Sequence, residues 1–84
     1  MAFTDQERAA LLELRGVGPS VVQRFEEIGI DSFEALAEYE MPDIVEQVAS
    51  MLGSTCWKNS PQARTAVASA VELARRSLAS QAAG

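Results

Sequence analysis

LLELRGVGPSVVQRF, residues 11–25, places two glycines and a proline between two apolar runs. Gly16 and Gly18 lack a Cβ atom, so they suit a point where the backbone must turn sharply. Pro19 suits the first turn of a helix, because its missing N–H would have no partner there. We therefore expect two helices joined by a tight hairpin, with Val17 buried between the glycines to hold the turn against the helices.

Both helices that flank this turn have recognisable ends. Thr4 and Glu7 form a capping box, which predicts that the first helix begins at Asp5, and Gly16 predicts its end. Gly29 is suited to end the second helix, because it can take a positive φ. Apolar residues at helical spacing form the two buried faces: Ala10, Leu11, Leu12 and Leu14 in the first helix, and Val21, Val22, Phe25 and Ile28 in the second.

Two further helical segments follow. Asp31 and Glu34 repeat the capping-box pattern and predict a short third helix. Pro42 and Asp43 predict the start of a fourth helix, which ends at Gly53. The residues expected to face inward are Phe33, Leu36 and Ala37 in the third helix, and Ile44, Val45, Val48, Met51 and Leu52 in the fourth.

The longest helical segment comes after a polar connection, GSTCWKNSP. Ser60 is placed to cap this helix and Pro61 to occupy its first position. Arg75 and Arg76 lie toward its C-terminus, where the helix dipole favours cations, and residues 81–84 are expected to form a frayed tail. Its apolar side consists of Val67, Val71, Ala74 and Leu78, with small residues beside them that allow close packing: Ala63, Ala66 and Ala70.

The fold class follows from these segments. No stretch alternates apolar and polar residues for long enough to predict a strand. A chain of 84 residues with 48% hydrophobic and 23% charged residues is typical of one globular domain and leaves little room for a second core. We therefore expect an all-α fold, a compact five-helix domain over residues 1–80.

The composition argues against catalysis and metal binding. The chain has no histidine, which removes the commonest general base and the commonest zinc ligand. Its single cysteine, Cys56, excludes an internal disulfide and a cysteine-rich metal site, and we expect it in the core. The closely spaced glutamates do not face one another on a helix. We expect no enzyme activity, no cofactor and no bound metal.

The sequence also bears on location. No apolar run approaches the roughly 18 residues that a membrane span requires. The first residues, MAFTDQER, lack the basic start and the apolar stretch of a secretory signal. We expect a cytoplasmic protein with no membrane partner.

The formal net charge of -5 is concentrated in one segment. Residues 8–24 contain three arginines and one glutamate, so this part of the chain is locally basic. Residues 25–46 contain eight acidic residues and no lysine or arginine. This acidic segment is interpreted as the solvated outer faces of the third and fourth helices, or alternatively as a docking surface for a basic partner.

The hairpin offers a site for an anion. Amides near Gly18 and Ser20 are expected to be exposed at the start of the second helix, where the helix dipole also favours negative charge. Such a contact with backbone phosphate carries no base information. Arg15 and Arg24 could supply electrostatic support, or could be solvated surface charges or partners of Glu13 and Glu27. The residues expected at this phosphate-binding site are Arg15, Gly16, Val17, Gly18, Ser20 and Arg24.

The same stretch resembles the helix-hairpin-helix motif, whose usual pattern is Leu-x-x-Leu-Pro-Gly-Val-Gly-Pro-Lys-x-Ala followed by an apolar helix. Residues 27–53, EIGIDSFEALAEYEMPDIVEQVASMLG, resemble the continuation seen in small bacterial helix-hairpin-helix proteins, often labelled pathogenicity-locus or mitomycin-resistance proteins. The resemblance covers roughly residues 8–76, with the hairpin motif at about 8–28. It implies a SAM-like architecture and a non-catalytic, sequence-independent contact with DNA. The matching positions of the motif are Leu11, Leu14, Gly16, Val17, Gly18, Pro19 and Phe25.

The chain departs from this pattern at three positions. Ser20 stands where family hairpins usually carry a basic residue, Val22 replaces the alanine, and Arg15 stands where proline is common. Losing one lysine–phosphate pair removes about one unit of the salt slope of DNA binding. We therefore expect weak, non-specific affinity for DNA, in the range of roughly 10⁻⁴ to 10⁻⁶ M or weaker.

The alternative function is a protein–protein interaction adaptor. Its contact surface would be the acidic segment 25–46 or the alanine-lined last helix, with the hairpin purely structural. Trp57 is interpreted as a lid on the core, with base stacking as the alternative, and Tyr39 is treated in the same way. The sequence is compatible with a monomer or with a homodimer that buries the last helix.

Overall fold

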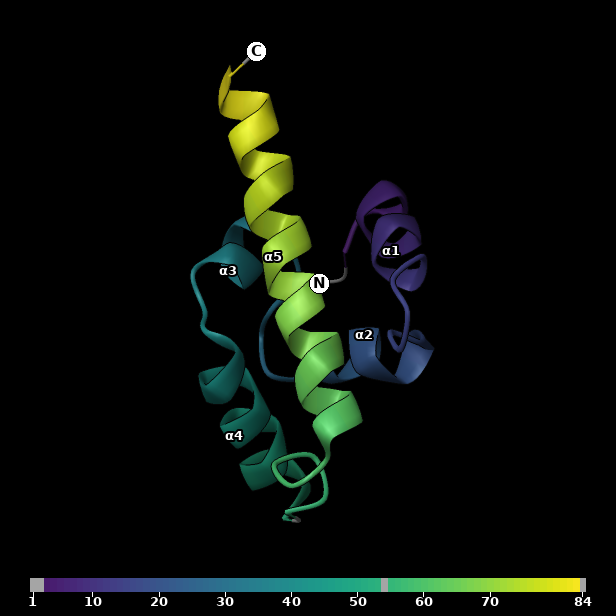
Figure 1. Cartoon of the computed structure of the whole chain (residues 1–84), viewed down its shortest axis with the longest axis vertical. Coiled ribbons are helices and arrows are strands. Elements are labelled where there is room, and N and C mark those ends of the chain that lie inside the picture. The colour runs from purple at the N-terminus through teal and green to yellow at the C-terminus, as the bar shows by residue number, and fades with distance from the viewer. Residues whose placement is uncertain (1–2, 54, 84) are drawn as a thin grey trace.

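The computed structural model describes residues 3–53 and 55–83 and contains five helices (Figure 1). The all-α fold class is confirmed, and no strand occurs in the described parts of the chain. None of the helices that are described is both long and apolar enough to cross a membrane. The helices are α1 (Asp5–Leu12), α2 (Pro19–Glu27), α3 (Phe33–Ala37), α4 (Met41–Leu52) and α5 (Pro61–Ala83).

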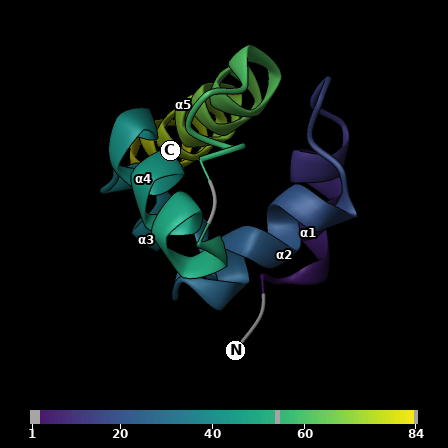
Figure 2. The ribbon, with the colours of Figure 1, turned by 90° about the horizontal axis from the view of Figure 1, so that it is seen from below.

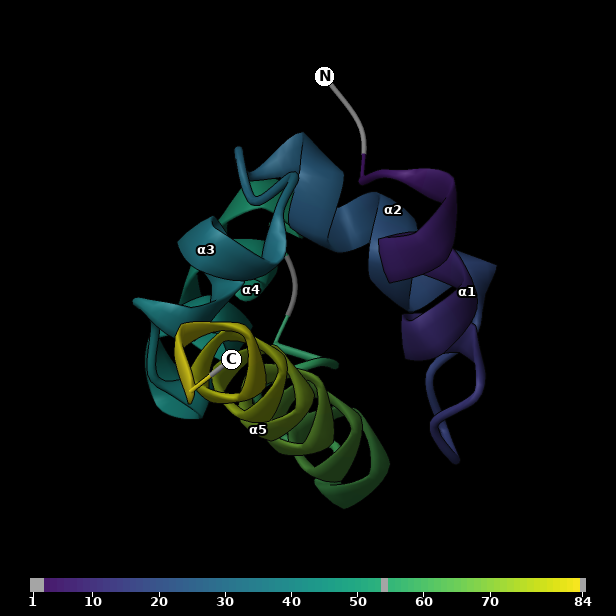
Figure 3. The same ribbon diagram turned by 90° about the horizontal axis from the view of Figure 1, so that it is seen from above.

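Helix α5 runs along the length of the molecule and organises the other four (Figure 1). Helices α3 and α4 pack against α5, α1 packs against α2, and α2 contacts α4. Viewed from above, α1 and α2 lie on one side of the molecule and α3 and α4 on the other (Figure 3). This arrangement brings the connection between α1 and α2 to one side, away from α4 (Figures 2 and 3).

A single hydrophobic core joins all five helices. Phe3 closes it at one end, with its ring edge-on to the rings of Phe25 and Phe33 at centroid distances of 6.5 Å. Alanines on α5 let the shorter helices approach closely, as their spacing predicts. The buried residues include Leu11 of α1, Val22 and Phe25 of α2, Leu36 of α3, Ile44 and Val48 of α4, and Ala66, Val67, Ala70 and Ala74 of α5.

The predicted starts of α1 and α5 are confirmed. The Thr4 hydroxyl accepts the Glu7 amide and the Glu7 carboxylate accepts the Thr4 amide, both at 3.1 Å, which is the expected capping box. The Ser60 hydroxyl accepts the amide of Ala63 at 3.2 Å, so it caps α5. Pro19 likewise occupies the first position of α2.

Two predicted helix boundaries are wrong by a few residues. Helix α1 ends at Leu12 and not at Gly16, because Leu14 donates to Leu11 and the chain leaves the α-helical hydrogen-bond pattern. The cap of α3 is Ser32 and not Asp31: its hydroxyl accepts the amide of Ala35 at 3.1 Å. The capping box predicted there is therefore replaced by a simple serine cap.

Glu7 of α1 also contacts the start of α3. Its second carboxylate oxygen accepts the amide of Phe33, the first residue of α3, at 3.1 Å. One side chain thus serves the start of its own helix and the start of a helix 26 residues further along the chain. This contact fixes α1 relative to α3.

The predicted burial of four residues is wrong. Leu12, expected on the buried face of the first helix, is 39% exposed, because it directly follows the buried Leu11 and so points to a different side of α1. Met51 and Leu52 are 40% and 41% exposed, because they lie in the last turn of α4, at the end of the molecule where the chain turns back toward α5 (Figure 1). Gly53 ends the helix there in the left-handed conformation, as expected. Cys56 is exposed as well, since it lies in the polar connection rather than on a helix face.

The end of α5 also differs from the expectation. The helix continues to Ala83, through most of the segment predicted as a frayed tail at 81–84, and Gly84 lies outside the described residues. Arg75 consequently lies inside the helix and not at its end. Its guanidinium donates to the carbonyl oxygens of Ala37 and Tyr39, each at 3.0 Å, so it satisfies carbonyls where α3 ends.

Candidate functional site

Residues 13–18, the Gly-Val-Gly turn, connect α1 to α2. Gly16 has φ +85, a left-handed conformation that favours glycine. Val17 is only 5% exposed, and its amide donates to the carbonyl of Leu14 at 3.2 Å. The burial predicted for Val17 is confirmed, so this residue holds the turn in place and offers a ligand neither its side chain nor its amide.

The two glycines of the turn differ in their surroundings. A Cβ atom built on Gly16 would lie 3.8 Å from the Cβ of Ala66, so the turn packs against α5 at this point. A Cβ built on Gly18 would meet no described residue within 4 Å, and the backbone there is extended. Gly18 can therefore accept a larger side chain without disturbing the fold, whereas Gly16 cannot do so without backbone strain.

Several backbone donors at the turn have no acceptor. Among the described residues, no hydrogen bond uses the amides of Gly16, Gly18 or Ser20. Gly18 is the N-cap of α2 and supplies no side chain to satisfy the helix start, and Ser20 is exposed in the first turn. Unpaired amides at a helix N-terminus, together with the positive end of the dipole, suit an anion.

The structure separates the two arginines predicted for this site. Arg15 is exposed and forms no ion pair with any described residue. Arg24 forms a salt bridge with Glu27 on the same helix, which is the alternative that the sequence left open for it. Arg8 is also paired, with Glu26 at 2.8 Å. Of the three arginines in residues 8–24, Arg15 is the one without an ion pair within the described chain.

A cleft of about 700 Å³ lies between the Gly-Val-Gly turn and the start of α5. Arg15, Gly16, Ser20 and Val21 line one side. The other side is formed by Trp57 and by residues of the first turns of α5, including Pro61, Gln62 and Thr65. Sequence reasoning did not identify this cleft, because no local pattern shows that residues 57–65 face residues 15–21.

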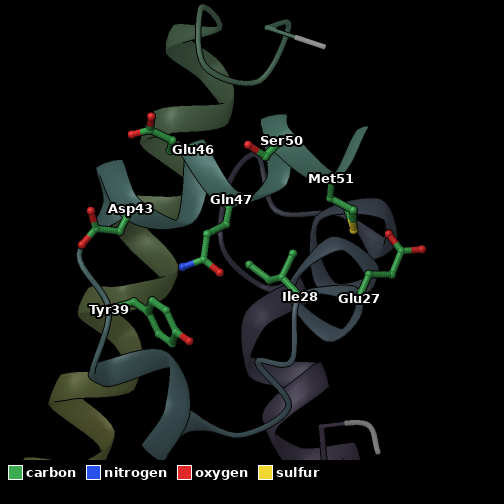
Figure 4. A pocket seen from close by; sticks show the side chains of 8 residues that line it. All are labelled: Glu27, Ile28, Tyr39, Asp43, Glu46, Gln47, Ser50 and Met51. Carbon is green, nitrogen blue, oxygen red and sulfur yellow. The ribbon is translucent and has the colours of Figure 1, made fainter. Parts of the chain in front are cut away.

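A second hollow of about 600 Å³, the acidic groove, lies at the opposite end of α2 (Figure 4). Glu27, Asp43 and Glu46 are its carboxylates, and Ile28, Tyr39 and Met51 are its larger apolar side chains. In Figure 4 the side chains of Tyr39 and Ile28 approach the groove from opposite sides, with Gln47 between them. Tyr39 also packs against the core, which agrees with its interpretation as a core residue.

The acidic segment 25–46 is partly neutralised. All eight of its carboxylate residues are at least partly exposed, which fits solvated outer faces. No group of three or more metal-binding side chains is arranged to hold a metal ion among the residues that the structure describes. The ion pairs of this segment are Glu26 with Arg8, Glu27 with Arg24, Glu40 with Arg75 at 3.0 Å, and Glu46 with Lys58 at 3.8 Å.

Comparison of the chain with protein-family models, with curated proteins and with solved structures gives no match.

Proposed function

We propose that the protein is a non-catalytic module that binds DNA independently of sequence, through the phosphate backbone, at the Gly-Val-Gly turn. The observation that carries this proposal is the group of amides at Gly16, Gly18 and Ser20, which have no acceptor within the described chain, beside Arg15, which has no ion pair there. Amides and a guanidinium are the donors that phosphate oxygens accept in protein–DNA contacts.

The resemblance of residues 11–25 to helix-hairpin-helix sequences supports the same function. We take residues 8–28 to be such a motif, with α1 and α2 as its helices and the buried Val17 as the residue that holds its turn. The resemblance implies a bacterial source, so we place the DNA contact in the cytoplasm. One arginine and a few amides give weak binding, in the non-specific range of roughly 10⁻⁴ to 10⁻⁶ M.

The net charge of -5 does not prevent this contact. The acidic groove begins at Glu27, at the C-terminal end of α2, whereas the Gly-Val-Gly turn lies at its N-terminal end. A helix of nine residues is about 14 Å long. This length exceeds the Debye length of about 8 Å at physiological salt, so the groove carboxylates are largely screened from a phosphate at the turn.

Gly18 provides the test of this proposal. Gly18→Glu adds a carboxylate at the turn, and Gly18→Gln adds an uncharged side chain of nearly the same size. Neither change strains the backbone, because the position is open and extended. We expect Gly18→Glu to abolish binding of labelled DNA in fluorescence anisotropy, while Gly18→Gln retains most of it.

The salt dependence provides a second readout. We expect log affinity to fall with log salt with a slope of about -1 to -3, which corresponds to neutralisation of one to three phosphates. Absence of binding even at about 20 mM salt, where the Debye length exceeds about 20 Å, would refute the proposal.

A second candidate function is favoured by the acidic groove. Exposed Met51 and the groove carboxylate Asp43, which has no ion pair within the described chain, together suit a basic amphipathic helix from a partner protein. This adaptor function predicts that Gly18→Glu has no effect and that Asp43→Lys abolishes the interaction. A synthetic lysine–leucine amphipathic peptide, compared with a scrambled peptide of equal charge, provides the probe in a calorimetric titration.

A further inference from the structure

The cleft beside the Gly-Val-Gly turn has the size and lining of a ligand site. Its volume of about 700 Å³ lies within the usual range for small-molecule sites, about 300–1,000 Å³. Val21, Trp57, Pro61 and Ala63 give it apolar walls, and Gln62 and Thr65 add polar groups that can form hydrogen bonds. An open apolar cleft with a few polar groups can take an amphipathic ligand.

Trp57 gives this cleft its distinctive chemistry. The residue is half-buried and packs against the core, which holds its indole in place, and the same side chain lines the cleft. Aromatic side chains in such positions stack against nucleobases, and every base offers a face for stacking. A tryptophan fixed by the core loses little conformational freedom when a base stacks on it.

The electrostatics of the cleft favour an anion. Arg15 is the one charged residue that lines it among the described residues, in contrast to the three carboxylates of the acidic groove. Helices α2 and α5 both begin at the cleft, with Ser20 in the first turn of one and Gln62 in the first turn of the other. Figure 2 shows the start of α5 and the Gly-Val-Gly turn on the same side of the molecule. Two helix N-termini and a guanidinium complement a phosphate.

We propose that this cleft binds an unpaired nucleotide of single-stranded DNA, with its base against Trp57 and its phosphate at Arg15 and the Ser20 amide. The inference rests on the proposed function, since the phosphate contact at the turn places the base beside the cleft. In duplex DNA the base is held in its stack and must be extruded, at a free-energy cost, before it can enter such a pocket. The protein therefore prefers single-stranded DNA to an intact duplex.

The single tryptophan of the chain makes this inference measurable. We expect titration with a short oligo-dT strand to quench or shift the fluorescence of Trp57, and titration with the matching dT–dA duplex to leave it nearly unchanged. Anisotropy of the same labelled DNAs measures binding without reference to Trp57. The strand is expected to bind at least about fivefold more tightly than the duplex, the lower limit for stacking of one base.

Two variants separate stacking from folding. Trp57→Leu removes the ring, and we expect strand affinity to fall to the level of the duplex, whereas Trp57→Phe retains part of the preference. Because Trp57 also packs against the core, Thr65→Glu provides an independent test. It places a carboxylate at an exposed position of the cleft wall and leaves the ring intact, with Thr65→Gln as its matched control. Circular dichroism checks that each variant is folded.

The outcomes distinguish this inference from the function on which it rests. Equal affinity for strand and duplex, with unchanged Trp57 fluorescence, would overturn the nucleotide site and leave phosphate binding at the turn intact. Binding to neither DNA would remove the proposed function and the inference with it. A preference for single-stranded DNA that is lost in Thr65→Glu but kept in Thr65→Gln would support both the nucleotide site and the phosphate contact at the turn.

Discussion

At the scale of single residues, the two glycines of the Gly-Val-Gly turn have different roles. Gly16 has φ +85 and lies against Ala66 of α5, so its lack of a side chain is required by the backbone. Gly18 is extended and open, so its lack of a side chain is not required by the fold. The open space beside Gly18 is therefore available to a ligand.

This difference predicts unequal costs of substitution. Gly16→Ala forces an alanine into the left-handed region, which costs about 1–2 kcal/mol of the free energy of unfolding. Gly18→Ala costs less, about 0.5–1 kcal/mol, because the open and extended position accepts the methyl group and the loss comes only from alanine being a poorer N-cap than glycine. Urea unfolding followed by circular dichroism measures both changes in the free energy of unfolding. Equal changes in the two variants would contradict the different roles given to Gly16 and Gly18.

The sequence predicted much of this turn but not its details. The Gly-Val-Gly-Pro order is enough to predict a hairpin, a buried Val17 and a helix that starts at Pro19, because these depend on local backbone chemistry. It could not show that Arg24 pairs with Glu27 while Arg15 stays without an ion pair among the described residues. That choice depends on the rotamers and distances of the folded chain.

At the scale of helices, long-range polar contacts fix how the elements meet. Arg75 of α5 donates to two carbonyls at the end of α3 and forms a salt bridge with Glu40 at 3.0 Å. Glu7 of α1 accepts the first amide of α3. Helix α3 has only five residues, too few to be stable by itself. Side chains of α1 and α5 stabilise it at its two ends.

Replacement of Arg75 tests this role. Arg75→Ala is expected to lower the free energy of unfolding by about 1–2 kcal/mol, because two carbonyls lose charged hydrogen-bond donors at a partly solvated site. The neighbouring Arg76 is exposed and appears in no ion pair or side-chain hydrogen bond of the described chain, so Arg76→Ala is the matched control and should cost no more than about 0.5 kcal/mol. Thermal unfolding compares them, and a similar loss in both variants would show that the contacts of Arg75 contribute nothing specific.

Contacts between helices that are distant in the sequence could not be predicted from local patterns. The Thr4–Glu7 capping box was predictable from a spacing of three residues, whereas the contact of Glu7 with Phe33 joins residues 26 positions apart. The cleft depends in the same way on α5 packing beside the turn. Met51 and Leu52 continue the apolar pattern of α4 but lie beyond the surface that α4 buries, so their exposure also follows from tertiary packing.

At the scale of the whole molecule, the distance of the acidic residues from the Gly-Val-Gly turn affects an anion at the turn more than the net charge does. Helix α4, which carries Asp43 and Glu46 of the acidic groove, lies on the opposite side of the molecule from the Gly-Val-Gly turn (Figures 2 and 3). Electrostatic repulsion between the groove and bound DNA therefore acts over a distance that salt can screen. The proposed phosphate contact at the turn is therefore compatible with the acidic charge of the whole chain.

This separation predicts that the effect of the groove on DNA binding depends on salt. Removing two groove charges with Asp43→Asn and Glu46→Gln should strengthen DNA binding at about 10 mM salt, where the Debye length is about 30 Å, and leave it nearly unchanged at about 150 mM, where that length is about 8 Å. Arg15→Gln should weaken binding at both salt concentrations, because the proposed site places Arg15 directly against the phosphate. Anisotropy titrations at the two concentrations make the comparison. A gain from the groove variant that persists at the higher concentration would mean that DNA passes close to α4, and the contact surface would then have to extend well beyond the turn.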